Sequence, residues 1–128
     1  MSAGVAREQF LRIAHLPDER IDLAEAALWI AAEQYEGLDV PGYLARLAEF
    51  AEHARPSVCA ATTPEQRIAA LNRFLYDEQS FRGNRSDYYD ARNSFLNEVI
   101  DRRTGIPITL AVVYLSIGAR LGLPVHGV

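Results

Sequence analysis

The 128-residue sequence predicts a mainly α-helical fold, with about six helices around a buried central helix at about residues 107–121. Three observations support this prediction. The segment 107–121 is apolar at almost every position, so we expect other parts of the fold to enclose it on nearly all sides. Five earlier segments carry apolar residues at helical spacing. Only residues 125–128 have the pattern of a strand, so a short terminal strand is the most that we expect.

Proline and glycine mark the ends of the predicted central helix. Pro107 suits the first helical position, because an N–H group there has no partner within the helix. Gly122 suits the left-handed residue after the last turn, and Pro124 prevents the helix from continuing. With about 15 residues, the segment is shorter than the ~20 that a bilayer requires, which favours a core helix. Its clearly polar residues share one narrow stripe: Thr109, Ser116 and Arg120.

The first two helices are expected over residues 6–15 and 23–35, with Pro17 interrupting the chain after the first. Asp22 and Glu25 have the spacing of a capping box at the start of the second helix.

The next three helices also begin with recognisable signals. Asp39 is expected to cap the third helix, and the sequence Arg55-Pro56-Ser57 is expected to break it. Thr63 and Pro64 form the start signal of the fourth helix. Asn93 or Ser94 is expected to cap the fifth helix.

The composition excludes several classes of protein. A formal net charge of −4 argues against a nucleic-acid partner, and the absence of lysine among the 13 basic residues is best explained by coding bias. The single cysteine excludes an internal disulfide and favours the cytoplasm. The N-terminus lacks a basic region followed by an apolar core, so we expect neither a signal peptide nor a membrane partner.

No pattern of residues predicts catalysis or metal binding. Cys59 is expected in the connection after residue 56, with no histidine beside it to activate the thiol. The three histidines have no metal-ligand spacing: His15, His53 and His126. Three carboxylates have no spacing that favours an acid–base pair: Asp87, Asp90 and Glu98. We therefore expect no catalytic residue, no metal and no cofactor.

Residues 77–92 have no periodicity and predict a long ordered loop, which makes them the first candidate binding surface. The polar side chains expected to contribute are Arg82, Asn84, Asp87, Tyr88, Tyr89, Asn93 and Asn97. The alternative is that these side chains satisfy the backbone groups of a buried loop.

The start of the central helix is the second candidate. Pro107, Ile108 and Thr109 form its first turn, and the free N–H groups of Ile108, Thr109 and Leu110 can bind an anion or an oxyanion. The alternative is a helix start without a ligand. We hypothesise that this helix start and the polar loop form one binding cleft.

Several short motifs occur together in the chain: Phe81-Arg82-Gly83-Asn84, Asp87-Tyr88-Tyr89, the segments 93–99, 102–108 and 121–124, and, nearer the N-terminus, 21–28 and 37–40. In combination these motifs resemble the SirB-type transglutaminase-like family of bacterial proteins. The resemblance covers essentially the whole chain. It implies the helical N-terminal part of a papain-like α+β fold. Residues 1–128 would then be one truncated domain, with a helical subdomain at 1–76 and the polar loop, a helix and the core helix at 77–128.

The resemblance implies the architecture of this enzyme superfamily but not its nucleophile. In the superfamily a catalytic cysteine opens the central helix, and the catalytic histidine and aspartate follow on later strands. Here Pro107 stands at the cysteine position, and the two other catalytic groups are expected beyond residue 128. Four other residues match the superfamily's pattern around this helix: Gly105, Ala111, Gly122 and Pro124.

The sequence therefore predicts a non-catalytic protein with a protein-binding, peptide-binding or regulatory role. The alternative is an amide hydrolase or acyl transferase whose catalytic residues lie beyond residue 128. A truncated domain would leave part of the central helix uncovered, and exposed apolar surface favours association. We therefore expect a protein or peptide partner, the missing C-terminal sheet, or a second copy of the chain to cover it.

Overall fold

The computed structural model describes residues 3–15, 22–87 and 89–123, and within these ranges it is mainly α-helical. Its elements are α1 (Ala3–Ala14), α2 (Leu23–Ala32), α3 (Val40–Ala60), α4 (Pro64–Asn72), the π-helical turn η2 (Arg73–Glu78), β1 (Arg82–Gly83), the 3-10 turn η3 (Ala91–Ser94), α5 (Leu96–Arg102), β2 (Thr104–Gly105) and α6 (Pro107–Arg120). The predicted fold class and the six α-helices are confirmed. The predicted strand at 125–128 and the break at Pro17 lie outside the described residues.

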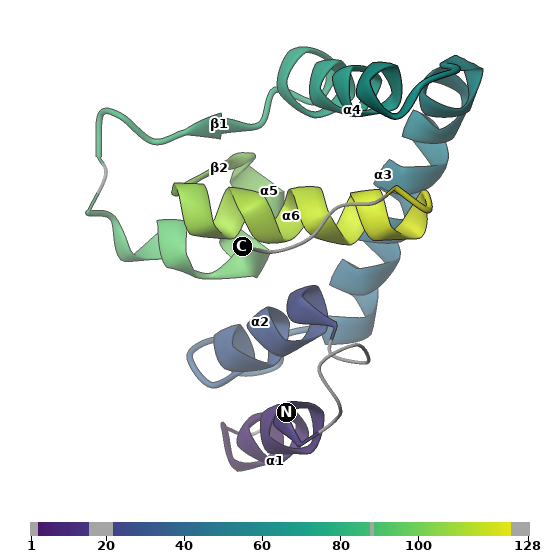
Figure 1. Ribbon diagram of the computed structural model, residues 1–128. Helices are drawn as coiled ribbons and strands as arrows, with labels where there is room; N and C mark the ends of the chain where they lie inside the picture. The colour runs from purple at the N-terminus through teal and green to yellow at the C-terminus, as the bar shows by residue number, and fades with distance from the viewer. Residues whose placement is uncertain (1–2, 16–21, 88, 124–128) are drawn as a thin grey trace.

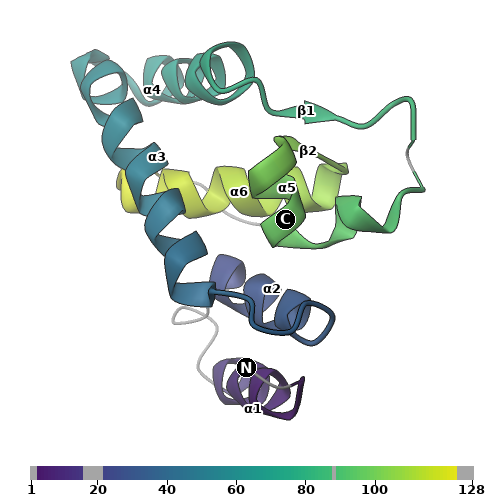
Figure 2. The same cartoon turned by 180° about the vertical axis from the view of Figure 1, so that it is seen from behind.

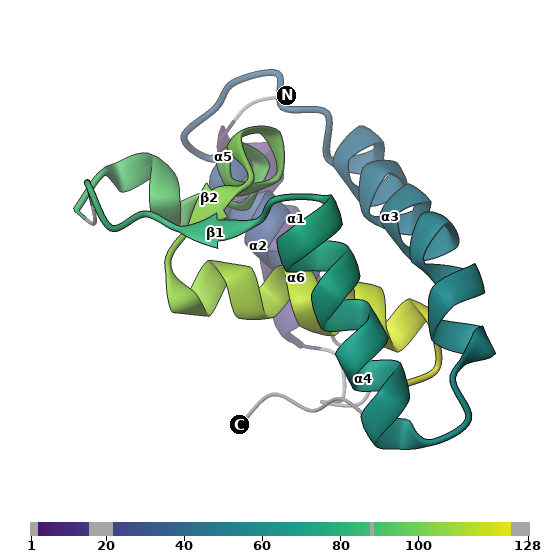
Figure 3. The same ribbon diagram turned by 90° about the horizontal axis from the view of Figure 1, so that it is seen from above.

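Helix α6 lies at the centre of the described fold (Figure 1). Helix α3 crosses it near its C-terminal end, and α2 and α5 also pack against it. Seen from behind, α4 lies on one side of α6, whereas α2 and then α1 lie on the other (Figure 2). The two short strands lie side by side next to the first turns of α6 (Figure 3).

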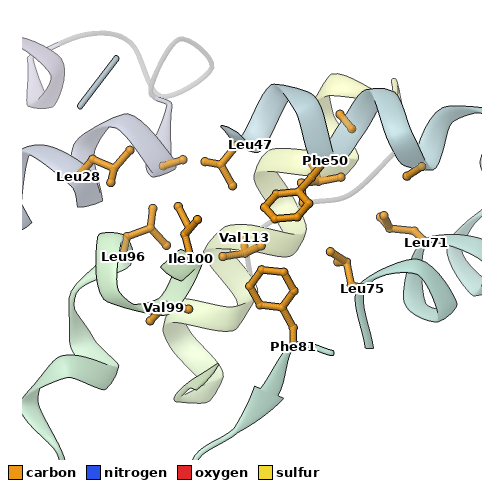
Figure 4. Close-up of a cluster of buried hydrophobic side chains, with 14 of the residues drawn as sticks. Leu28, Leu47, Phe50, Leu71, Leu75, Phe81, Leu96, Val99, Ile100 and Val113 are labelled. Carbon is orange, nitrogen blue, oxygen red and sulfur yellow. The ribbon is translucent and has the colours of Figure 1, made fainter. Parts of the chain in front are cut away.

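One apolar core joins these elements (Figure 4). Helices α2, α3, α4, α5 and α6 and the turn η2 contribute fully buried side chains to it. They include Leu28, Leu47, Leu71, Leu75, Leu96, Val99, Ile100 and Val113. Phe81, just before β1, packs edge-on against Phe50 of α3 with ring centroids 5.7 Å apart. The loop that follows Phe81 is therefore anchored to the core at its start.

The polar stripe of α6 faces the interior, and an apolar stripe faces outward. Thr109 and Ser116 are buried, and Arg120 Nη1 donates to the Ser116 carbonyl at 3.2 Å. On the opposite side Ile108 is 70% exposed, and Ala111 and Ala119 are exposed as well. The expectation that the fold encloses α6 on nearly all sides is therefore wrong for this face. The described helices are simply too few to surround it.

Local capping signals were largely confirmed. The Asp22 carboxylate accepts from the Ala24 and Glu25 amides at 3.0 and 3.2 Å, and Asp39 accepts from Gly42 at 3.0 Å. Thr63 Oγ1 accepts from the Gln66 amide at 3.1 Å.

Two details at α2 differ from the prediction. Glu25 does not return a bond to the Asp22 amide, because its carboxylate accepts from Trp29 Nε1 at 3.0 Å. The helix also ends at Ala32, earlier than the predicted residue 35, and a turn closed by Leu38 N to Tyr35 O follows.

The C-terminal end of α6 was predicted correctly. Gly122 has a left-handed φ of +74°, and its amide donates to Ala119 O at 3.1 Å. Leu123 N donates to Gly118 O at 3.0 Å. This pair of bonds is the Schellman pattern that ends many helices, and it depends on the freedom of glycine to take a positive φ.

Two predicted boundaries are wrong. Helix α3 continues through Pro56, which is exposed, so water can reach the carbonyl of Glu52 that loses its helical partner. Neither Asn93 nor Ser94 caps α5. The Asp90 carboxylate instead caps η3 by accepting from the Arg92 amide at 2.9 Å.

We expect Pro56→Ala to raise the free energy of unfolding by about 1–2 kcal/mol. The substitution restores one helical hydrogen bond and removes the ring clash, and the greater freedom of the unfolded chain offsets part of this gain. Urea denaturation would measure the change. Pro64→Ala is the matched control, because Pro64 occupies the first position of α4 and its replacement should change stability by less than about 0.5 kcal/mol. Equal effects of the two substitutions would contradict the prediction.

Candidate functional site

Strands β1 and β2 form a parallel pair, and among residues 3–15, 22–87 and 89–123 no further strand pairs with the other edge of β1. Arg82 N donates to Arg103 O and Asn84 N donates to Gly105 O, both at 3.0 Å. Because backbone groups alternate in direction along a strand, the N–H and C=O groups of Gly83 point away from β2. Gly83 is exposed, and a Cβ atom added there would meet nothing within 4 Å. The outer edge of β1 is therefore accessible.

The partner strand is held close to the start of α6. A Cβ atom at Gly105 would lie 2.7 Å from Thr109 Oγ1 and 3.0 Å from Val99 Cγ2. Only glycine allows this approach, so Gly105 fixes the distance between β2, α5 and α6.

Asn84 and Asn93 hold the loop between β1 and η3. Asn84 Nδ2 donates to Asn93 Oδ1 at 3.1 Å, and Asn84 Oδ1 accepts from the Asp87 amide at 3.0 Å. Asn93 Nδ2 donates to Asp87 O at 3.0 Å. Both asparagines are buried, and Asn93 is 0% exposed. These bonds replace the backbone ladder that an irregular loop lacks.

Thr109 joins this loop to the first turn of α6. Its Oγ1 lies 2.8 Å from Asn93 O, to which it donates, and accepts from the Ile106 amide at 3.1 Å. The two candidate surfaces predicted from the sequence are thus connected through one side chain.

The loop and the strands line an open groove with a volume of about 670 Å³. This volume lies within the usual range of ligand sites, about 300–1,000 Å³. The lining residues come from β1 and the loop after it, from the ends of η3 and α5, and from β2. They are Arg82, Gly83, Asn84, Arg85, Ser86, Asp87, Asp90, Arg92, Arg102 and Thr104.

Asp90 is the best-paired charge of the groove. Its carboxylate accepts from Arg92 Nε at 3.0 Å and Arg92 Nη2 at 2.5 Å, and Arg102 Nη2 lies 3.8 Å away. The hydrogen bonds from the Arg92 side chain are the main cause that lowers the pKa of Asp90 to about 2. Asp90 therefore stays ionised throughout the physiological pH range.

Arg103 does not line the groove but links β1 to the core. It ends α5 in a left-handed conformation with φ of 55°, and its Nη1 donates to Gln79 O and Gln79 Oε1, each at 2.9 Å. Its guanidinium also lies over the rings of Phe50 and Phe81, 5.3 and 5.9 Å from their centroids. Because Arg103 O accepts from Arg82 N, these contacts fix the position of β1.

The structure divides the predicted polar-loop residues into two groups. Arg82, Asn84 and Asp87 line the groove. Asn93 and Asn97 are buried, and Asn97 Oδ1 has no partner in the part of the chain that the structure describes. For Asn93 the alternative raised from the sequence, that polar side chains satisfy a buried loop, accounts for its contacts.

Three further candidates, Tyr89, Pro107 and Ile108, do not line the groove. Tyr89 is 92% exposed, and Tyr88 lies outside the described residues. Pro107 and Ile108 are exposed at the start of α6. Binding roles for these residues stay predictions.

The helix start offers fewer free amides than predicted. Leu110 N donates to Ile106 O at 2.9 Å, so the prediction of a free Leu110 amide is wrong. Ile106, the N-cap residue, has no side-chain acceptor for the amides of Ile108 and Thr109.

Several lining residues were missed from the sequence: Gly83, Arg85, Ser86, Asp90, Arg92, Arg102 and Thr104. The spacing of Asp90 and Arg92 was a usable signal, since Asp at the residue before a turn often accepts from the second residue after it. Arg102 carried no local signal, because the β1–β2 pairing brings it to the groove.

The remaining titratable candidates do not assemble into a site. Cys59 lies in the last turn of α3 and is exposed, whereas a connection was expected there. Glu98 accepts from the Tyr35 hydroxyl at 3.0 Å. Among residues 3–15, 22–87 and 89–123, no group of three His, Cys, Asp or Glu side chains is placed to hold a metal ion. No helix in the same ranges has the length and apolarity needed to cross a membrane.

We expect Asn93→Ala to lower the free energy of unfolding by about 2–4 kcal/mol. It leaves the buried Asn84 side-chain amide without its partner, at a cost of about 1–3 kcal/mol, and removes the bond to the part-buried Asp87 carbonyl, worth about 0.5–1.5 kcal/mol. Thermal and urea unfolding would measure the loss. Ser94→Ala is the neighbouring control, since Ser94 is exposed and its replacement should cost less than about 0.5 kcal/mol. A loss at Asn93 no larger than the one at Ser94 would contradict a supporting role.

Comparison with known proteins identifies longer relatives. A UPF0162 protein of Xylella fastidiosa is 39% identical over 116 residues, which are 91% of this chain and 41% of the relative. A UPF0162 protein of Vibrio cholerae is 39% identical over 82 residues, covering 64% of this chain and 30% of the relative. Human F-box only protein 21 is 48% identical over 63 residues, covering 49% of this chain and 10% of the relative. The chain thus spans about two fifths of the Xylella relative.

No solved structure matches the chain significantly. A family model described as the transglutaminase-like superfamily matches residues 42–128, a range that contains the groove, α5 and α6. The chain therefore belongs to the transglutaminase-like superfamily.

Proposed function

We propose that this chain is the N-terminal part of a SirB-type transglutaminase-like protein that binds an extended peptide segment of a partner protein without catalysing a reaction on it. The observation that carries the proposal is the open edge of β1, a strand whose residues Arg82 and Gly83 also line the groove. A regulatory role and a cytoplasmic location, both expected from the sequence, belong to the same proposal.

The edge of β1 supports peptide binding by strand addition. In this mode an extended peptide forms main-chain hydrogen bonds with the unpaired groups of an edge strand. The N–H and C=O groups of Gly83 are directed outward, and the missing side chain leaves room for a second backbone. The bonds of Asn84 and Asn93 hold the loop in place, so little ordering is needed on binding.

The start of α6 supports the non-catalytic part of the proposal. Pro107 occupies the first position of α6, where the resembling enzymes carry their cysteine. Proline supplies neither a nucleophile nor an exchangeable proton. The alternative, an amide hydrolase or acyl transferase completed by residues beyond 128, would need a nucleophile other than a thiol at this point.

The outward stripe of α6 favours a second contact, with a further part of the same protein. Ile108, Ala111 and Ala119 expose apolar surface, and the curated relatives are more than twice as long as the region they share with this chain. We propose that this face packs against the C-terminal part of the domain, or against a second copy when that part is absent.

We expect Gly83→Pro to abolish peptide binding and Gly83→Ala to preserve it. Proline removes the outward N–H group, whereas alanine keeps it, and Gly83 does not have a positive φ. Both variants should stay folded within about 1 kcal/mol, because proline is tolerated on the solvent side of an edge strand.

The measurement is the binding of a short fluorescent peptide of alternating threonine and glutamate by anisotropy, with thermal unfolding as the folding control. Equal binding by the two variants would show that strand addition does not occur at β1. Turnover of amide or ester substrates by highly purified chain would contradict the non-catalytic assignment.

A further inference from the structure

The groove has a positive charge although the whole chain is acidic. Its lining contains four arginines and two aspartates, Asp87 and Asp90, which give the groove a formal charge of +2. The whole chain has a net charge of −4. A local excess of one sign in a concave surface raises the local concentration of ligands with the opposite sign.

Two of these arginines have no acidic partner. Asp90 is engaged by Arg92 through three side-chain hydrogen bonds and lies within 3.8 Å of Arg102. Arg82 and Arg85 are exposed, and neither forms a side-chain hydrogen bond or an ion pair within the described ranges.

Arg102 adds to this unbalanced charge. Its Nη1 is buried and has no acceptor among the residues that the structure describes. Its Nη2 has only the distant Asp90 oxygen, which already accepts from Arg92. The charge of Arg102 is therefore only partly compensated within the fold.

We infer that the peptide bound by this groove is acidic, with carboxylate side chains that pair with Arg82 and Arg85. The inference rests on the proposed strand addition at β1 and specifies its ligand. Arg82 belongs to β1, so a residue of the added strand lies opposite it, about 5 Å away between Cβ atoms. A guanidinium presents a planar set of donors that matches a carboxylate. Arg85 follows the end of β1 and would meet a second carboxylate farther along the peptide.

The test compares two peptides on the full chain by fluorescence anisotropy. One alternates threonine and glutamate, and the other alternates threonine and glutamine. We expect the glutamate peptide to bind about tenfold more tightly at low salt, and this difference to shrink as salt screens the charges.

Charge-neutral variants identify the arginines that bind the carboxylates of the glutamate peptide. Arg82→Gln and Arg85→Gln should each weaken glutamate-peptide binding about threefold to fivefold and reduce the preference for the glutamate peptide over the glutamine peptide. Arg73→Gln is the matched control, because Arg73 is an exposed arginine of η2 outside the groove. It should change neither affinity.

Three results distinguish the preference for acidic peptides from strand addition at β1. Equal affinity for both peptides, with binding still lost in Gly83→Pro, would overturn the acidic preference and leave strand addition standing. No binding of either peptide would overturn both. A single-stranded DNA oligonucleotide that binds more tightly than the glutamate peptide, with the same dependence on Arg82 and Arg85, would also overturn the acidic-peptide assignment.

Discussion

The arrangement of the groove depends on the buried Asn93. Its side chain accepts from Asn84 and donates to Asp87 O, and its carbonyl accepts from Thr109 of α6. Asn93 thus connects two points of the loop after β1 with each other and with the central helix α6. Without these bonds the loop would have no regular structure to satisfy its backbone groups, and the edge of β1 would not be held open beside the charged side chains.

Much of the fold was predictable because the signals were local. Asp39 and Thr63 cap helices that begin next to them, and Gly122 ends α6 through bonds within one turn. Prediction failed where tertiary packing decided the outcome. Pro56 was expected to end α3, but its exposed position allows the helix to continue. The apolar sequence of α6 alone predicted a helix enclosed on nearly all sides, and only the interpretation of the chain as a truncated domain predicted an uncovered face.

The site was predictable only in part for the same reason. The absence of periodicity identified the loop that carries Arg82 and Asn84, yet it did not distinguish residues that line the groove from Asn93, which supports it. Arg102 reaches the groove from α5 because β1 and β2 pair across a separation of more than 20 residues in sequence. Such pairing of two-residue strands leaves no alternating pattern that a sequence analysis can detect.

Amide hydrogen exchange along β1 tests most directly whether the strand presents an open edge beside a fixed loop. The amides of Arg82 and Asn84 donate to β2, so we expect them to exchange slowly, whereas the outward amide of Gly83 between them should exchange at a rate close to that of an unstructured peptide. This slow–fast–slow pattern would be read residue by residue with NMR. Slow exchange at Gly83, or equally fast exchange at all three amides, would contradict the open edge.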